Sequence, residues 1–309
     1  MSGSDGEAGR HVSGRVMRFG AHLPVAGFGG ERPAASTLIG CAEAADALGY
    51  TTLCANDHIR FAVPWIDGLV ALGAAAARTR SITLMTTAAL LVVRGSGPLG
   101  SALVALHHLS GGRLRVGLTP GSTQADYEAV RVPFAERWVR FDAEMSALRS
   151  FLEREAPAAA IPLWIASWGS EAGLRRVARH GDGWLASAYH STAEHFSQCL
   201  AYLTNQLERA QKPPGAFPNA IATMYLHLTD DPAEAQSVLE KLVSPYQAPS
   251  DLRDRSLVGT TVDCIDKLRR LETAGAKEVF VWPIGDEVKQ LQQFAEEVIP
   301  SFQPLQRLG

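Results

Sequence analysis

The sequence lacks several features that would assign it to a common class of protein. Its formal net charge of −3 gives no electrostatic basis for binding nucleic acid. No apolar run is long enough to span a membrane. The four cysteines have neither metal-type nor redox spacing, so we expect reduced, mostly buried thiols, no metal site and a cytoplasmic location. They are Cys41, Cys54, Cys199 and Cys264.

Two further signals are missing near the N-terminus. Residues 1–16 are rich in glycine, serine and charge and lack the apolar centre of a secretion signal. We expect a flexible tail there, followed by one domain over residues 17–309. The glycine-rich stretch Val25–Gly30 lacks the GxGxxG spacing of a dinucleotide-binding turn.

What the chain does contain is a regular alternation of strand-like and helix-like segments. With 309 residues, of which 46% are hydrophobic, it can bury a large core. Eight strands alternating with helices predict an α/β fold, a single (β/α)8 TIM barrel with loop insertions at its C-terminal face. A doubly wound sheet is the alternative. The expected strands are Arg18–Pro24, Thr51–Ala55, Ile82–Val93, Leu114–Leu118, Leu163–Ala166, Trp184–Ala188, Ile221–Leu228 and Glu278–Trp282.

Three stretches between these elements read as loops. Thr119–Phe134 follows the fourth strand and is expected to be irregular. Val25–Ala35 and Ser244–Ser256 are rich in proline or glycine and polar residues, which fits mobile lids over a site or plain surface connections.

The turn after the fifth strand is the most distinctive local feature. Ser167, Trp168, Gly169 and Ser170 separate that strand from a helix whose first residue is expected to be capped by Ser170. Small residues at a helix N-terminus leave backbone N–H groups free to bind phosphate. The alternative is an ordinary capped helix in a βαβ unit.

Polar or aromatic residues end all eight expected strands. In a barrel these ends meet at one mouth, so we expect a pocket there. The residues at or just beyond the strand ends are His22, Asp57, His58, Thr86, Thr87, Thr119, Ser122, Ser167 to Ser170, Ser187, Tyr189, His190, His227, Thr229 and Trp282.

Several motifs together resemble the luciferase-like monooxygenase superfamily of flavin- and deazaflavin-dependent barrel enzymes. They are ANDHI at residues 55–59, LHHLSGGRLRVGL at 106–118, DYEAVRVPFAERWVRFDAEM at 126–145, PLWIASWGSEAGLRRVARHGDGW at 162–184 and, more weakly, VGTTVDCIDKLRRLETAGAKEVFVW at 258–282.

The resemblance implies a flavin-type ring across the barrel mouth, with its phosphate on Ser167, Trp168, Gly169 and Ser170. The family often has a non-proline cis peptide in the third strand, beneath the ring. We expect that bond, and contacts to the ring, among the small residues Thr86, Thr87 and Ala88. A plain strand with small core residues is the alternative.

The resemblance leaves two cofactors open. The segment DHIRFAVPW, residues 57–65, is similar to that of deazaflavin-dependent sugar-phosphate dehydrogenases, which favours coenzyme F420 over FMN. Those dehydrogenases carry a glutamate soon after strand four, whereas this loop reads TPGSTQ, with no carboxylate before Asp126. A reductase of a small-molecule C=C or C=N bond is therefore expected. An FMN-dependent monooxygenase and a non-catalytic barrel subunit remain alternatives.

His58 is the expected proton-transferring residue, because imidazole titrates near neutral pH. Asp57 either orients His58 or caps the following loop. The alternative for His58 is a structural histidine at a strand end. The family resemblance also implies a possible homodimer, while the substrate is not named by any motif.

Four residues are expected to line the substrate pocket, namely His22, Ser122, His190 and Trp282. Loop packing is the alternative for His22. Trp168 and Trp282 could stack on a ring or shape the substrate pocket, and barrel packing is the alternative for both.

Overall fold

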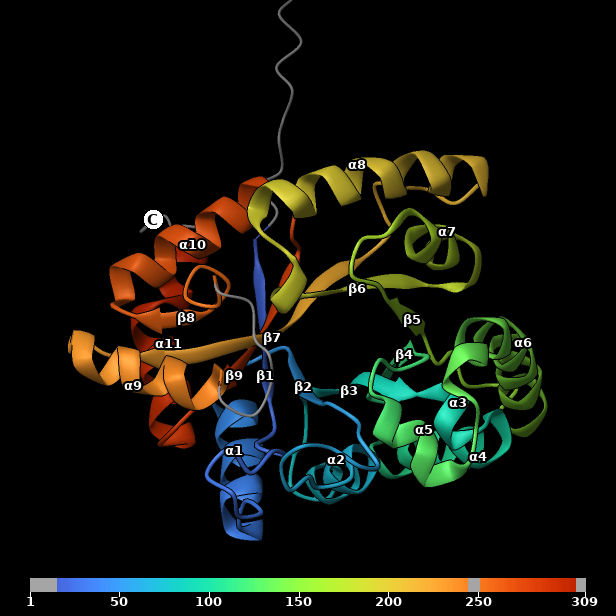
Figure 1. Cartoon of the computed structure of the whole chain (residues 1–309), viewed down its shortest axis with the longest axis horizontal. Helices are drawn as coiled ribbons and strands as arrows, with labels where there is room; N and C mark the ends of the chain where they lie inside the picture. Colours follow the sequence, from blue (N-terminus) through green and yellow to red (C-terminus); the bar gives the residue numbers. More distant parts are fainter. Residues whose placement is uncertain (1–15, 244–250, 304–309) are drawn as a thin grey trace, which may run out of the picture.

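A computed structural model describes residues 16–243 and 251–303. Parallel strands form a closed barrel, and the helices lie around its outside (Figure 1). The predicted TIM barrel is confirmed. The expected N-terminal tail lies outside the described residues except for Val16, as do residues 244–250 of the candidate lid.

The barrel closes through eight of the nine strands. Their order is β1-β2-β3-β4-β5-β6-β7-β9, and β9 pairs with β1. The three-residue strand β8 pairs only with the second half of β7. The strands are β1 (Arg18–His22), β2 (Thr52–Ala55), β3 (Thr83–Leu90), β4 (Leu114–Thr119), β5 (Leu163–Ala166), β6 (Gly183–Ser187), β7 (Asn219–Leu228), β8 (Leu257–Gly259) and β9 (Glu278–Pro283).

Helices connect successive strands and cover the barrel. Among the described residues, none is both long and apolar enough to cross a membrane. The helices are α1 (Ala35–Ala47), α2 (Gly68–Ala76), α3 (Leu91–Arg94), α4 (Ser96–Leu109), α5 (Gln124–Val130), α6 (Arg137–Glu155), α7 (Glu171–His180), α8 (Ala193–Arg209), α9 (Pro232–Val243), α10 (Thr261–Thr273) and α11 (Glu287–Glu297), with 3₁₀ turns at Phe134–Glu136, Ala188–His190 and Ile299–Phe302.

Three segments differ from the sequence prediction. The predicted third strand, Ile82–Val93, ends at Leu90, where the chain turns into the short helix α3, because apolar and β-branched residues continue past the strand end. The predicted loop Thr119–Phe134 contains α5, which buries Asp126 and Tyr127. The short strand β8 is additional to the eight expected strands.

The barrel strands are buried on both faces, as expected for a parallel sheet covered by helices. A large core fills the space between strands and helices. A smaller core lies inside the barrel and includes large aromatic residues and several alanines. Its buried members are Cys54, Met85, Ala88, Trp164, Leu185, Ala220, Ala222 and Phe280.

The N-terminal end of the barrel is closed by an ion pair. Arg115 donates to both carboxylate oxygens of Glu278 at 2.9 and 3.1 Å, and the hydroxyls of Thr51 and Thr52 donate to the same carboxylate. Burial alone would raise the pKa of Glu278, but Arg115 and these hydroxyls hold it below its usual value. Glu278 is therefore a buried carboxylate anion with its partners supplied by three strands.

Candidate active site

A cavity of about 700 Å³ opens at the C-terminal ends of the barrel strands. Its walls come from the ends of β2 to β7 and β9, and from the loops that follow them. A cavity of this size at this face is the usual place for the active site of a barrel enzyme.

The turn after β5 has the geometry that its sequence predicts. Ser170 is the N-cap of α7, and its hydroxyl oxygen accepts the N–H of Gly173 at 3.2 Å. The first N–H groups of a helix have no intrahelical partner, so the amides before Gly173 face a ligand or solvent. The Glu171 carboxylate pairs with Arg175. An anion at this turn would meet backbone donors and the positive end of the helix dipole.

Two glycines leave room at this turn. Gly169 has φ of +102°, and a Cβ there would lie 2.4 Å from Cys199 Sγ. A Cβ on Gly173 would lie 2.3 Å from Ser167 Oγ. Side chains at either position would push the turn out of its present shape. Ser167, Trp168 and Ser170 line the cavity, while Gly169 shapes the turn behind it.

The floor of the cavity is made of small apolar residues. Ala88, Ala166 and Ala222 line it together with Leu185. The Thr87–Ala88 peptide is cis, which confirms the position predicted in the third strand. These short side chains leave a shallow apolar surface, and such a surface fits a planar ring.

Thr86 does not line the cavity, contrary to the sequence prediction. Its hydroxyl donates to the carbonyl of Gly117 on β4 at 2.8 Å, and its side chain is buried. The neighbouring Thr87 does line the cavity. Successive residues of a strand face opposite sides, so Thr86 and Thr87 differ. The register shift of β3 between Thr86 and Ala89 lies in the same segment.

Asn56 links two irregular strands across the mouth. Its amide oxygen accepts the hydroxyl of Thr87 at 3.0 Å, and its amide nitrogen donates to the hydroxyl of Thr223 at 3.3 Å. Thr223 has φ of +65° and lies in the bulge of β7. Thr223 lines the cavity, so one asparagine side chain fixes the shape of the floor from both sides.

His22 lies beneath the cavity rather than in its wall, so the prediction that it lines the substrate pocket is wrong. It is fully buried, stacks on Trp282 with ring centroids 4.9 Å apart, and accepts the N–H of Thr223 through Nε2. Burial lowers the pKa of His22 to about 3. It is therefore a neutral structural residue that supports the β7 bulge.

His58 lies in the cavity wall, held by a carboxylate from another element. Its Nδ1 is 2.7 Å from Asp126 Oδ2, while Asp126 Oδ1 accepts the N–H groups of Ile59 and Arg60. Because a carboxylate only accepts hydrogen bonds, this contact selects the Nδ1–H form and leaves Nε2 for proton exchange. Among the described residues, no hydrogen bond is made by Nε2.

Asp57 does not orient His58, contrary to one of the two sequence interpretations. Its carboxylate accepts the N–H of Leu90 at 2.9 Å and binds Arg94 Nε at 2.7 Å. Arg94 also pairs with Asp67, the N-cap of α2. Burial alone would lower the pKa of Arg94, but the two carboxylates raise it. Asp57 therefore ties together the ends of β2 and β3, although it also borders the cavity.

Two stacked rings lie at the rim of the cavity near Ser167–Ser170, the turn after β5 that we call the phosphate-type turn. Trp168 is 52% exposed and stacks on His190 with centroids 3.9 Å apart, which excludes barrel packing for Trp168. His190 Nδ1 lies 3.3 Å from Ser187 Oγ. Burial, with a smaller contribution from Arg255, lowers the pKa of His190. Ser122 borders the cavity on the β4 side, and both Ser122 and His190 lie where the sequence placed them.

The opposite side of the cavity is lined by a connected set of rings, which we call the aromatic wall. The rings touch in sequence, with centroid separations of 4.1 to 6.0 Å. Trp282 is buried within this wall and borders the cavity, so it both packs and shapes the pocket. The wall consists of His58, Phe61, Trp65, Tyr225 and Trp282, which all line the cavity. Phe28 contacts Tyr225 and Trp282 without lining the cavity, and Tyr189 links Tyr225 to the neighbouring His190.

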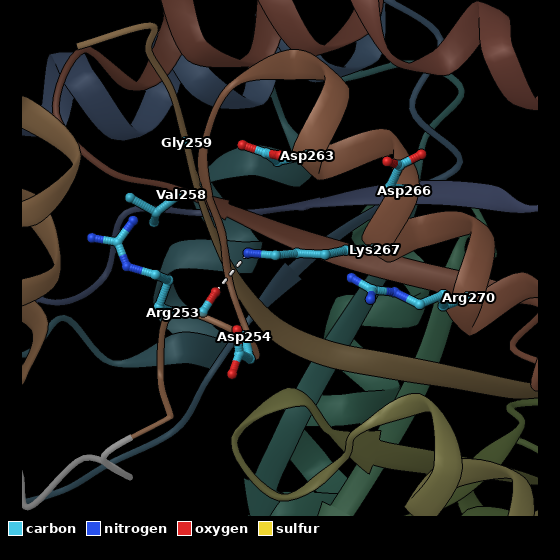
Figure 2. Close-up of a pocket in the computed structure, with 8 residues that line it drawn as sticks. All are labelled: Arg253, Asp254, Val258, Gly259, Asp263, Asp266, Lys267 and Arg270. Carbon is cyan, nitrogen blue, oxygen red and sulfur yellow. Dashed lines mark hydrogen bonds between the residues drawn. The ribbon is translucent and has the colours of Figure 1, made fainter. Parts of the chain in front are cut away.

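A second, smaller cavity of about 250 Å³ lies between α10 and the segment before β8, and it shares no lining residue with the mouth (Figure 2). Lys267 reaches across it and donates to the carbonyls of Arg253 and Ser256 at 2.6 and 2.9 Å. These bonds fasten the segment to α10. We therefore assign this cavity a structural role.

Comparisons with known proteins agree with the fold. A family model described as luciferase-like monooxygenase matches residues 17–257. An uncharacterised protein of Mycobacterium tuberculosis is 28% identical over 158 residues, which is 45% of this chain and 55% of that protein. The chain thus matches about half the length of its curated relative.

Solved structures share the whole fold at low identity. A monooxygenase from Streptomyces bottropensis has a TM-score of 0.78 at 20% identity and covers 93% of this chain and all of its own. An F420-dependent secondary alcohol dehydrogenase, solved with an F420–acetone adduct, has a TM-score of 0.81 at 15% identity, covering 94% and 100%. The oxygenating component of 3,6-diketocamphane monooxygenase from Pseudomonas putida, solved with FMN, has a TM-score of 0.71 at 15% identity, covering 93% and 100%.

The family match extends over most of the chain and over every element that builds the mouth from β1 to β7. The four strongest motifs found in the sequence fall within it. The chain belongs to the luciferase-like monooxygenase family.

Proposed function

We propose that the cavity at the barrel mouth binds coenzyme F420 and that the protein is an F420-dependent reductase of a C=C or C=N bond in a small molecule. The observation that carries the proposal is a combination within one cavity. A helix N-terminus suited to phosphate adjoins a shallow apolar floor suited to a planar ring, and His58 lies in the wall beside it.

The donor set fits such a cofactor. Ser167, Ser170 and the first-turn amides of α7 would hold the phosphate, and Ala88 and Ala222 would lie under the ring. When bound in its reduced form, a deazaflavin supplies hydride and hardly reacts with oxygen. The resemblance of residues 57–65 to deazaflavin enzymes favours it over FMN.

The chain's own residues supply the proton side of the reaction. Reduction of a double bond adds a hydride to one atom and a proton to the other. In its protonated form His58 would give up the proton on Nε2, directly or through a water, and become the neutral Nδ1–H imidazole that Asp126 holds in one orientation. A proton from solvent would then restore the protonated form. No carboxylate precedes Asp126 in the loop after β4, and Asp126 itself is committed to His58 and two backbone amides.

The test is a titration of the purified full chain with F420, FMN and riboflavin, followed by tryptophan fluorescence. We expect micromolar affinity for F420 and at least about tenfold weaker binding of FMN. Riboflavin lacks the phosphate, so it should bind more weakly than FMN by a further factor of about ten, the effect of one or two lost charged hydrogen bonds. Gly169→Ala should weaken the binding of all phosphorylated probes, because its Cβ would collide with Cys199.

Gly49→Ala is the matched control, because Gly49 also has a positive φ of 78° but has open space around it. It should leave cofactor affinity unchanged. Tight binding of FMN with none of F420 would replace this proposal with the FMN-dependent monooxygenase. Absence of binding by all three compounds would favour the non-catalytic barrel. A homodimer also stays a prediction, to be tested by sedimentation.

A further inference from the structure

We propose that the aromatic wall is the substrate subsite and that it selects planar, conjugated compounds that carry no negative charge. This inference rests on the proposed function of the cavity, because it takes the opposite side to be occupied by the cofactor phosphate. It goes further by naming the chemical class of the substrate and the residues that choose it.

The barrel order places the wall opposite the phosphate-type turn. In the closed order of strands, β1 is four strands away from β5 in both directions. The wall is centred there, with Trp65 after β2 and Trp282 on β9, the two strands that flank β1. The turn Ser167–Ser170 follows β5. The two ends of the cavity therefore face each other across the barrel axis.

The rings of the wall support one another and form a fixed surface. Trp65 contacts both His58 and Trp282 edge to face, at 4.7 and 6.0 Å. Tyr225 lies 5.8 Å from Trp282, and the Tyr189 hydroxyl donates to that of Tyr225 at 2.5 Å. Aromatic faces held in this way favour flat partners, by stacking or edge contacts in addition to the burial of apolar area.

The distribution of charge separates the two ends of the cavity. Among the described residues that line it, Arg137 is the only lysine or arginine, and it belongs to α6 on the side of the phosphate-type turn. Its guanidinium stacks on Phe134 at 4.0 Å. The aromatic wall contains no lysine or arginine, and its one ionisable ring, His58, is already paired with Asp126. A carboxylate or phosphate on the substrate would therefore be desolvated there without a free cation to pair with.

His58 connects recognition to chemistry. It is a member of the wall, stacked on Phe61 with centroids 4.1 Å apart, and it is also the proposed proton donor. A planar substrate lying along the wall therefore has an edge beside the imidazole. A neutral conjugated double bond, such as that of an unsaturated carbonyl compound, fits this arrangement.

The test uses isothermal titration of the full chain with two probes of similar shape: coumarin and coumarin-3-carboxylate. Each titration is done with and without F420. Coumarin should bind at least about tenfold more tightly than the carboxylate. Trp65→Leu should weaken coumarin about tenfold, whereas Trp138→Leu, an aromatic change on the Arg137 side of the same cavity, should alter it less than about twofold.

Phe61→Leu provides a second wall variant if Trp65→Leu does not fold, and it should weaken coumarin about threefold. Equal or tighter binding of the carboxylate would overturn the inference, and so would an unchanged coumarin affinity in both wall variants. Loss of F420 binding with coumarin selectivity intact would contradict the proposed cofactor and leave the wall's selectivity standing.

Discussion

The two ends of the barrel use buried polar groups in different ways. At the N-terminal end, Arg115 and Glu278 pair with each other within the barrel. At the mouth, Asp126 binds His58 and Asn56 binds Thr223. Both partners border the cavity, and these bonds hold them in place for a ligand. The N-terminal end contributes stability, whereas the mouth holds a surface in a shape that folding alone would not require.

The largest effect should come from the mouth, in activity rather than stability. His58→Ala removes the proton donor, and the initial rate of F420-dependent reduction of a coumarin-type substrate should fall by about 10²- to 10⁴-fold. Cofactor affinity should change little, whereas the free energy of unfolding should fall, because buried Asp126 loses its imidazole partner and the His58 ring no longer packs on Phe61 and Trp65. A variant that keeps full turnover would remove His58 from the mechanism.

The next effect should come from the N-terminal end of the barrel, in stability alone. Arg115→Ala leaves the buried carboxylate of Glu278 with only the half-exposed Arg18, at 3.6 Å, as a cation. The free energy of unfolding should fall by about 3–5 kcal/mol. Urea denaturation measures it. Arg140→Ala, which breaks a surface pair with Glu136, is the control and should cost less than about 1 kcal/mol. Equal losses of unfolding free energy in the two variants would show that the buried Arg115–Glu278 pair stabilises the protein no more than the surface pair does.

The smallest effect is the pH dependence of stability that comes from His22, which lies beneath the cavity. The folded-state pKa of His22 is depressed to about 3, so between its ordinary value of 6.5 and 3 only the unfolded state takes up this proton. Stability therefore falls with falling pH by about 1.4 kcal/mol per unit in that window from His22. His22→Gln should remove this part of the slope.

Urea denaturation at several values between pH 6 and 4 compares the wild type with His22→Gln. His108→Gln, at an exposed histidine of α4, should keep the wild-type slope. Parallel curves for wild type and His22→Gln would mean that His22 is not held neutral by burial.

Local patterns in the sequence were enough to predict the barrel, the turn at Ser167–Ser170 and the position of His58. Each of these depends on residues close in the chain: an apolar strand, a cap and a strand end. The cis peptide was found at Thr87–Ala88, within the segment expected from the family resemblance.

The partners of these residues could not be predicted in the same way. The sequence offers Asp57 as the neighbour of His58, but the contact is made by Asp126, 68 positions away and on a helix that reads as a loop. An acidic residue in the first turn of an unrecognised helix was the available signal. His22 likewise ends a strand, yet the β7 bulge covers it, and a bulge leaves no clear mark in a single sequence.

The most direct test of the central claim is a crystal structure of the full chain soaked with F420. The account predicts that the cofactor phosphate accepts hydrogen bonds from Ser167, Ser170 and the first amides of α7, with the ring over Ala88 and one edge near His58. A phosphate bound elsewhere, or a ring that does not cover the alanine floor, would contradict it.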